Sequence, residues 1–132
     1  MGLPLFKNIS LDELIQLSRE GLEAATFEEI IGRLPFSLQE WARFLGVSER
    51  TLIRIRKENK SLGTTASDKV IRITQLYQKG TEVFRDEEKF RDWLDVRIMA
   101  VGGVKPKSLL DTSFGLELVD NTLGQIEYGV FA

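Results

Sequence analysis

The 132-residue sequence contains no cysteine and no histidine. Without cysteine it has no disulfide framework and no thiolate metal site, which fits a reducing cytoplasm. Without histidine it lacks the commonest general base and metal ligand. No window approaches 18 uninterrupted apolar residues, and the N-terminus lacks the basic start and long apolar run of a signal peptide. We therefore expect a soluble, cytoplasmic protein that binds no metal and no cofactor.

Catalytic patterns are equally scarce. No phosphate-cradling glycine-rich loop follows a strand, and the acidic residues between Asp86 and Asp95 are more typical of a solvated helix face than of an acid/base pair. The sequence therefore predicts no catalytic residue and no enzyme.

The formal net charge of −2 conceals a strong asymmetry. Residues 1–42 carry 3 basic and 7 acidic side chains, residues 43–79 carry 9 basic and 3 acidic, and residues 80–132 carry 6 basic and 10 acidic. Local field rather than total charge sets the affinity for phosphates. The basic middle block between two acidic flanks indicates two partners of opposite character.

The stretch 37–57, SLQEWARFLGVSERTLIRIRK, predicts a helix-turn-helix. Ser37 caps a first helix with Glu40 as the reciprocal partner, Gly46 suits a left-handed turn, and Ser48 caps a second helix. The turn holds the second helix at an angle to the first, and a helix presented in this way fits the DNA major groove. The predicted DNA-binding residues are Ser48, Glu49, Arg50, Thr51, Arg54, Arg56 and Lys57. The alternative is an ordinary helical corner with a solvated basic face, and the Ala, Gly and capping-Ser spacing favours DNA binding over it.

The rest of the chain is also predicted to be helical, with seven or eight helices and no strand of useful length. Ser10 and Thr26 are expected to cap the first two helices, and the first helix is expected to bury Leu11, Leu14, Ile15 and Leu17. Thr65 is expected to cap a core helix that bends or breaks at Gly80. Lys69 and Arg72 near its start either touch a DNA backbone or are simply solvated.

The fold class is thus an all-α helical bundle containing a helix-turn-helix, followed by a small C-terminal helical domain. The expected domains are residues 1–64 and 65–132.

The second half carries the more specific pattern, Gly102-Gly103-x-x-Pro106-x-x-Leu109-Leu110-Asp111-Thr112-x-x-Gly115, and ends in the run 126–132, IEYGVFA. With the helix-turn-helix, this pattern over about residues 35–132 resembles the Xre/MbcA/ParS-type antitoxins of bacterial toxin–antitoxin pairs. The N-terminal 34 residues carry no such motif.

The resemblance implies a protein with two roles. Its helix-turn-helix binds and represses the operator of its own operon, and its C-terminal half binds a cognate RES-type toxin and covers the entrance to the toxin's NAD pocket. Whether that toxin hydrolyses NAD or transfers ADP-ribose is left open. The residues expected to contact the toxin are Gly102, Gly103, Tyr128, Val130, Phe131 and Ala132.

One recognition helix reads too few bases for useful specificity, so a homodimer on a double-stranded palindromic operator is expected. The alternative function is a stand-alone dimeric repressor without a toxin partner, in which the C-terminal half serves only for dimerisation.

Overall fold

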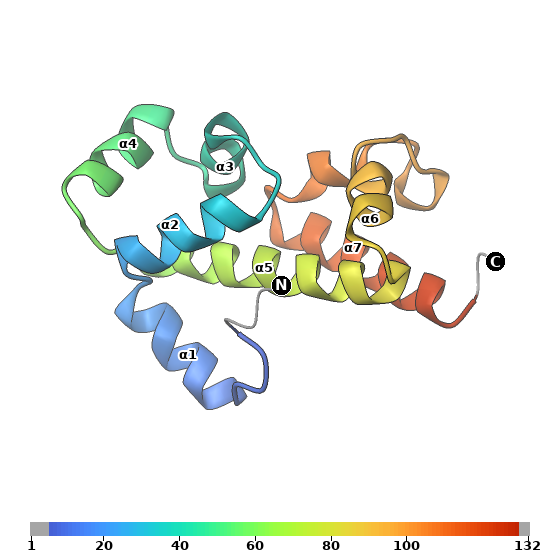
Figure 1. Cartoon of the computed structure of the whole chain (residues 1–132), viewed down its shortest axis with the longest axis horizontal. Helices are drawn as coiled ribbons and strands as arrows, with labels where there is room; N and C mark the ends of the chain where they lie inside the picture. The colour runs from blue at the N-terminus through green and yellow to red at the C-terminus, as the bar shows by residue number, and fades with distance from the viewer. Residues whose placement is uncertain (1–5, 130–132) are drawn as a thin grey trace. The chain divides into compact units, whose positions relative to one another are not determined.

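The computed structural model describes residues 6–129, and its regular elements are helices (Figure 1). They are α1 (Leu11–Glu20), α2 (Ala24–Arg33), α3 (Leu38–Leu45), α4 (Glu49–Lys57), α5 (Thr64–Phe84), α6 (Glu87–Leu94) and α7 (Ser113–Glu127), with 3₁₀ turns η1 (Met99–Val101) and η2 (Pro106–Leu109). Within residues 6–129, β-structure is limited to an isolated antiparallel bridge between Ile98 and Val104. The predicted all-α fold is confirmed.

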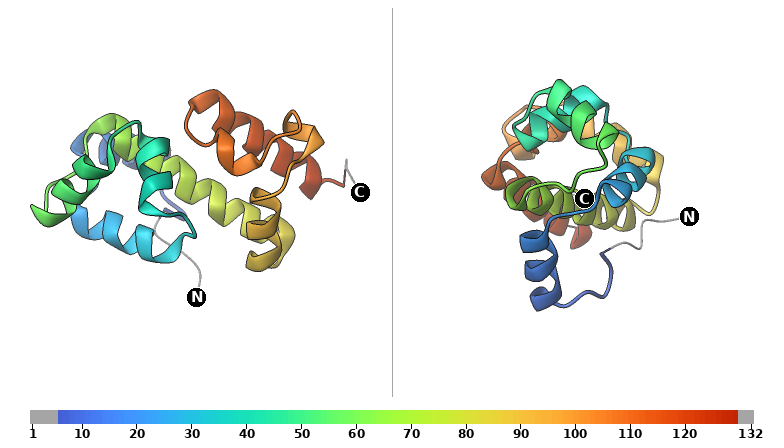
Figure 2. Two further views of the ribbon diagram at one scale, coloured as in Figure 1. Left: turned by 90° about the horizontal axis from the view of Figure 1, so that it is seen from above. Right: turned by 90° about the vertical axis from the view of Figure 1, so that its left-hand side faces the viewer.

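The chain divides into two compact units between Thr74 and Gln75, inside α5. In unit 1, helices α2, α3 and α4 gather around the first half of α5 (Figure 2). That half buries Val70 and Ile73. The boundary expected at residues 64 and 65 coincides with the start of α5, and it stays a prediction of where the DNA-binding part ends.

An aromatic cluster fills unit 1. The fully buried Trp41 meets the rings of Phe27 and Phe36 edge-on, each at a centroid distance of 5.7 Å, and Phe44 at 5.9 Å. Edge-to-face pairs add about 0.5–1.5 kcal/mol each beyond the area that they bury. Since these rings come from α2, α3 and the turn between them, the cluster fixes the support on which α4 sits.

Two expectations for the N-terminal helices were wrong. Ser10 does cap α1, accepting a hydrogen bond from the Glu13 amide at 3.2 Å, but α1 buries none of its residues, and Leu11 and Ile15 are 72% and 41% exposed. Periodicity identifies the apolar face of a helix but not whether another element covers it. The second helix begins at Ala24 and receives no side-chain cap, so Thr26 lies inside α2 rather than before it.

Helix α5 also differs from its prediction at Thr65 and at Gly80. It begins at Thr64, so Thr65 lies within its first turn, and it continues through Gly80 to Phe84 without a break. Gly80 lies against the ring of the fully buried Phe90 from α6, and a Cβ atom there would overlap that ring. The glycine therefore permits close packing of α6 on α5 rather than interrupting the helix.

The Phe90 ring is the centre of unit 2. It contacts Tyr77 at 5.4 Å, Phe84 at 5.6 Å and Trp93 at 6.0 Å between ring centroids. Leu110, Val119 and Leu123 add fully buried aliphatic side chains from the end of η2 and from α7. The second half of α5 thus has its own core, separate from the aromatic cluster of unit 1.

Candidate functional site

The helix-turn-helix is built from the local interactions that the sequence predicts. The Ser37 hydroxyl accepts the Glu40 amide at 3.0 Å while the Glu40 carboxylate accepts the Ser37 amide at 2.9 Å. Gly46 ends α3 in the left-handed region at φ 70°, which suits a residue without a β-carbon. The Ser48 hydroxyl then accepts the Thr51 amide at 3.0 Å and starts α4. These caps fix where α3 ends and α4 begins.

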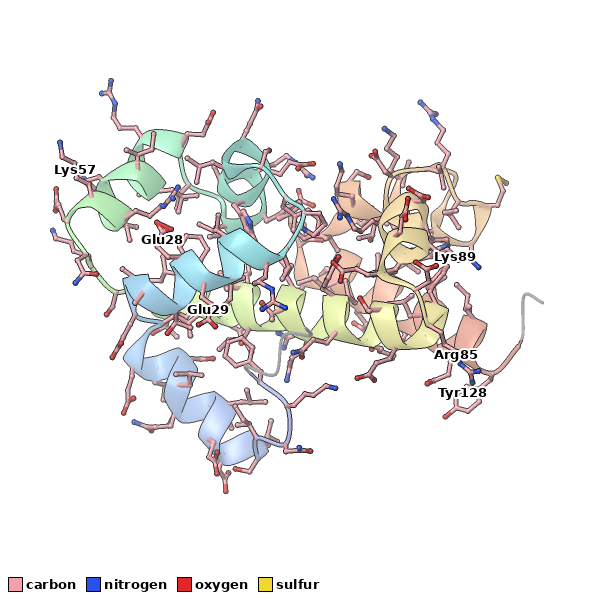
Figure 3. All side chains as sticks on the ribbon, in the orientation of Figure 1. Glu28, Glu29, Lys57, Arg85, Lys89 and Tyr128 are labelled. Atoms are coloured by element: carbon pink, nitrogen blue, oxygen red, sulfur yellow. The ribbon has the colours of Figure 1, made fainter. Side chains whose placement is uncertain are left out.

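Helix α4 buries Leu52 and turns a polar, basic face outward. The exposed members of the predicted DNA-binding set are Ser48, Glu49, Arg50, Arg54 and Lys57. Thr51 is half-buried, with its hydroxyl 2.9 Å from that of Ser48. Lys57 points away from unit 1 (Figure 3). The face carries three cations and one carboxylate, a balance that attracts phosphates.

Arg56 differs from these residues. Its Nη2 donates to Glu28 Oε2 at 3.1 Å and its Nε donates to Glu28 Oε1, so a two-point ion pair joins α4 to α2. Figure 3 shows Glu28 between these two helices. Sequence reasoning did not identify Glu28, because a partner 28 residues away leaves no local spacing signal. The Arg56 guanidinium is partly neutralised within the unit.

The two cations near the start of α5 also have partners. Lys69 donates to the backbone carbonyl of Phe44 at 3.1 Å, and Arg72 donates to Asp68 at 3.1 Å, one helical turn earlier. Lys69 therefore stabilises the C-terminal end of α3, where a cation is favourable. Neither interpretation of this pair included these internal partners, and contact of Lys69 and Arg72 with a DNA backbone stays a prediction.

In unit 2 the glycine pair closes a turn. Gly102 and Gly103 have φ values of 88° and 77°, which residues with a side chain rarely adopt. The Gly103 amide donates to the Ile98 carbonyl at 2.9 Å, and the Ile98 amide donates to Val104 at 3.1 Å. The pair therefore reverses the chain between α6 and η2.

The remainder of the C-terminal pattern builds the start of α7. Pro106 is buried at the first position of η2, and Leu110 is fully buried. Thr112 caps α7 by accepting the Gly115 amide at 3.0 Å. Gly115 lies so close to the backbone of Leu109 that a Cβ atom would overlap the Leu109 carbonyl oxygen. These residues form one internal joint, so the pattern has a folding role.

The predicted toxin-contacting residues are spread over unit 2. Gly102 is exposed and Gly103 half-buried at the turn, and Tyr128 is 84% exposed at the end of α7. Val130, Phe131 and Ala132 lie outside the described residues. The described members of the set thus sit at two places rather than in one pocket.

Two ionisable side chains in unit 2, Tyr77 and Asp95, have shifted pKa values. Burial, with a hydrogen bond from its hydroxyl to Glu87 at 2.7 Å, raises the pKa of Tyr77. Lys107 and Lys105, whose Nζ atoms lie 3.2 and 3.4 Å from Asp95 Oδ1, lower the pKa of the Asp95 carboxyl. Both interactions join neighbouring segments of unit 2 and hold these segments together.

Residues 6–129 contain no gathering of three or more carboxylates suited to a metal ion. None of the helices in that range is long and apolar enough to cross a membrane.

The capped corner of α3 and α4, with its exposed basic second helix, defines unit 1 as a helix-turn-helix domain of the DNA-binding kind. Comparison with known families agrees: residues 13–74 match the antitoxin Xre-like helix-turn-helix domain. Residues 79–129 match the antitoxin Xre/MbcA/ParS C-terminal toxin-binding domain.

Similar proteins of known assignment share most of their length with this chain. An Antitoxin Xre of Photorhabdus laumondii is 26% identical over 95% of this chain and 85% of its own length. An Antitoxin Xre of Yersinia enterocolitica is 26% identical over 100% of this chain and 88% of its own length. A protein of a Sphingobium strain named Prs ADP-ribosylating antitoxin is 28% identical over 89% of this chain and 80% of its own length.

The chain belongs to the Xre/MbcA/ParS family of antitoxins, with a helix-turn-helix domain followed by a toxin-binding domain. The resemblance predicted from the sequence is confirmed, as is the absence of enzymatic function, because members of this family are antitoxins. A toxin and DNA are accordingly its two kinds of partner.

Proposed function

We propose that this antitoxin neutralises a RES-type, NAD-using toxin by covering the entrance to the toxin's active site, and that as a homodimer it represses its own operon. Both activities belong in the cytoplasm, where operator DNA and NAD are found. The observation that carries the proposal is that the two units expose surfaces of opposite charge. Unit 1 turns a basic helix outward, and unit 2 ends in an acidic helix with an exposed aromatic residue.

The DNA-binding part of the proposal uses α4 as the recognition helix. Arg50 and Arg54 are exposed and can pair with base edges or phosphates, and Lys57 suits a phosphate contact. Ser48, Glu49 and Thr51 lie at the N-terminal end of α4, the part that meets base edges in helix-turn-helix proteins. Two copies would present their recognition helices about 34 Å apart, one helical turn of DNA, to a palindromic operator.

The toxin part of the proposal uses the C-terminal end. Tyr128 is exposed at the end of α7, and the chain continues from it to Val130, Phe131 and Ala132. The aromatic ring of Tyr128 beside the exposed carboxylate of Glu127 suits a pocket that binds an aromatic, anionic dinucleotide. The name of the Sphingobium relative supports NAD use, because ADP-ribosyl transfer takes its ADP-ribose from NAD. We therefore favour ADP-ribosyl transfer as the toxin's reaction.

The toxin part is tested by sequencing the genes beside this one and expressing any RES-type reading frame found there, alone and together with the full chain. The toxin alone should lower cellular NAD, and the full chain should restore it. A chain ending at Glu127 should bind the toxin but leave NAD consumption active. If the truncated chain neutralises fully, the toxin is covered by another part of unit 2. If no toxin gene adjoins this one, or if the full chain leaves NAD falling, the stand-alone repressor becomes the better assignment.

The DNA part is tested by mobility shift with the promoter region of the same operon. Arg50→Ala or Arg54→Ala should each cost about 1–3 kcal/mol if the side chain reads a base edge. Unchanged operator affinity in both variants would show that α4 is not the recognition helix. Light scattering on the free chain and on the DNA complex gives the stoichiometry.

A further inference from the structure

Helix α7 has an exposed stripe that none of residues 75–129 covers. Phe114, Leu118, Asn121, Gln125 and Tyr128 follow one another at alternating spacings of four and three residues, so they lie on one face. All five are exposed, with Phe114 at 82%, Leu118 at 40% and Tyr128 at 84%. We call this set the α7 ridge. At a rise of about 1.5 Å per residue it is roughly 21 Å long.

The opposite face of the same helix supplies the core. Leu116, Val119 and Leu123 are buried, and Gly115 is pressed against the backbone of Leu109. The rotation of α7 about its axis is therefore fixed by packing on its inner side. The ridge cannot turn inward to hide Phe114 without opening the core.

The ridge is apolar at both ends and has an acidic surrounding. Residues 108–129 contain Asp111, Glu117, Asp120 and Glu127 and no lysine or arginine. Asp120 is paired with Lys79, whose Nζ lies 3.0 Å from its Oδ1, whereas Glu117 is exposed beside the ridge. A complementary surface therefore offers a pocket for an aromatic side chain and a basic rim.

We propose that the α7 ridge is the docking surface for the toxin, with Phe114 as an anchor at the end far from the chain terminus. The inference rests on the toxin partnership stated above and adds a second point of attachment to it. Phe114 fills an apolar pocket on the toxin, Leu118 extends that contact, and the ridge aligns α7 so that Tyr128 and the residues after it reach the active-site entrance. Buried aromatic anchors of this kind dominate the affinity of many interfaces.

The observations favour the toxin over the other occupants of such a face. In a two-fold dimer formed through the ridge, the same face of each copy would meet, which brings Glu117 and its acidic neighbours together. Like charges at an interface are unfavourable. DNA is excluded by the same acidic character. The ridge also belongs to the segment that matches a toxin-binding domain, and it leads directly into the proposed covering residues.

The test measures binding of the full-length chain to the purified RES-type protein, once the search of the neighbouring genes described above has identified it. A double variant, Phe114→Ser with Leu118→Ser, should weaken binding about 30-fold or more, the size expected when an anchor residue is lost. Met99→Ser is the matched control, because Met99 is 86% exposed in the same unit but lies on η1. It should change the affinity less than about threefold. Operator binding by the double variant should be unchanged, which shows that unit 1 is folded, and its Trp93 fluorescence should match that of the unmodified chain, which shows that unit 2 is folded.

A charge variant gives an independent readout. Glu117→Lys should slow association with the toxin and remove part of its salt dependence, because rim charges act mainly on the encounter rate. Its dissociation rate should change little.

The outcomes separate this inference from the proposed function. If the unmodified chain does not bind the adjacent RES-type protein, the proposed function fails and the inference fails with it. If the unmodified chain neutralises the toxin and the double variant binds equally well, only the ridge assignment is wrong. If the double variant becomes monomeric in light scattering while toxin binding per protomer is retained, the ridge is an interface between copies and the inference is overturned.

Discussion

Gly115 gives the sharpest test of how unit 2 is held together. It lies in the first turn of α7, is buried, and approaches the backbone of Leu109 so closely that a Cβ atom would overlap the Leu109 carbonyl oxygen and lie 2.8 Å from its carbonyl carbon. The obstacle is main chain rather than the end of a flexible side chain. Leu110, the residue after Leu109, is fully buried, so the Leu109 backbone cannot move away from Gly115 without disturbing the core.

The expected cost of Gly115→Ala follows from three effects. Overpacking of a well-packed site costs about 1–3 kcal/mol, and a main-chain obstacle places this site at the upper end. Displacement of the Gly115 amide also weakens the cap from Thr112, which is worth about 1 kcal/mol. Alanine returns about 1 kcal/mol through its better helix propensity. We expect a net loss of about 3 kcal/mol in the free energy of unfolding of unit 2.

Gly124→Ala is the matched control in the same helix. The nearest atom to a Cβ at Gly124 is the flexible Lys79 Nζ at 3.9 Å, an ordinary contact. Only the propensity gain remains, so this variant should be more stable by about 0.5–1 kcal/mol.

The assay is urea unfolding followed by fluorine NMR of the chain labelled with fluorotryptophan. Trp41 reports unit 1 and Trp93 reports unit 2, so each transition is read on its own resonance. Gly115→Ala should move the Trp93 midpoint to lower urea and Gly124→Ala should move it to higher urea. An unchanged or raised midpoint for Gly115→Ala would refute the packing argument.

Three further predictions concern other sites. Arg56→Gln, which removes the ion pair with Glu28, should weaken operator binding without changing the slope of log affinity against log salt. Lys57→Gln should make that slope shallower by about 1. Mobility shifts across a salt series distinguish the two variants. The pKa of Asp95 is lowered in the folded chain. The contribution of this carboxylate to stability is therefore present above the ordinary carboxyl pKa and is lost as the pH falls through the pKa of the folded chain. The urea midpoints of Asp95→Asn and of the unmodified chain should differ at pH 7 and converge in acid. Gly80→Ala should destabilise unit 2 by about 1–2 kcal/mol, because overlap with a buried aromatic ring outweighs the helix propensity gain, and a raised Trp93 midpoint would contradict this.

The features predicted correctly from the sequence are those made by residues three or four positions apart. The capping box at Ser37, the cap at Ser48 and the left-handed turn at Gly46 are local hydrogen-bond and backbone requirements, and each is present. Such interactions leave a readable spacing because their geometry is set within one helical turn.

The features that the sequence did not predict depend on residues that are distant along the chain. Leu11 and Ile15 are exposed because no element among residues 6–74 covers them, which a helical period cannot reveal. Gly80 looked like a weak point because the ring that needs its space is ten positions away in another helix. Glu28 was missed for the same reason. The C-terminal pattern was correctly associated with its family, but the pattern alone did not distinguish residues that build unit 2 from residues that contact a partner.

The two faces of this antitoxin should separate by salt concentration, because they use different forces. Three exposed cations on α4, if all contact phosphates, give a slope of about −2.7 in log affinity against log salt for each protomer, so an increase from about 0.1 to 0.5 M salt weakens DNA binding about 80-fold per recognition helix. The α7 ridge is anchored by apolar side chains, whose burial salt does not weaken, and only its acidic flank is screened. Toxin binding should therefore fall less than about fivefold over the same range. Measured on the complete complex of antitoxin, toxin and operator DNA, high salt should release the DNA and keep the toxin bound. Equal losses for both partners would show that the toxin is held mainly by charge, and that Phe114 is not the anchor.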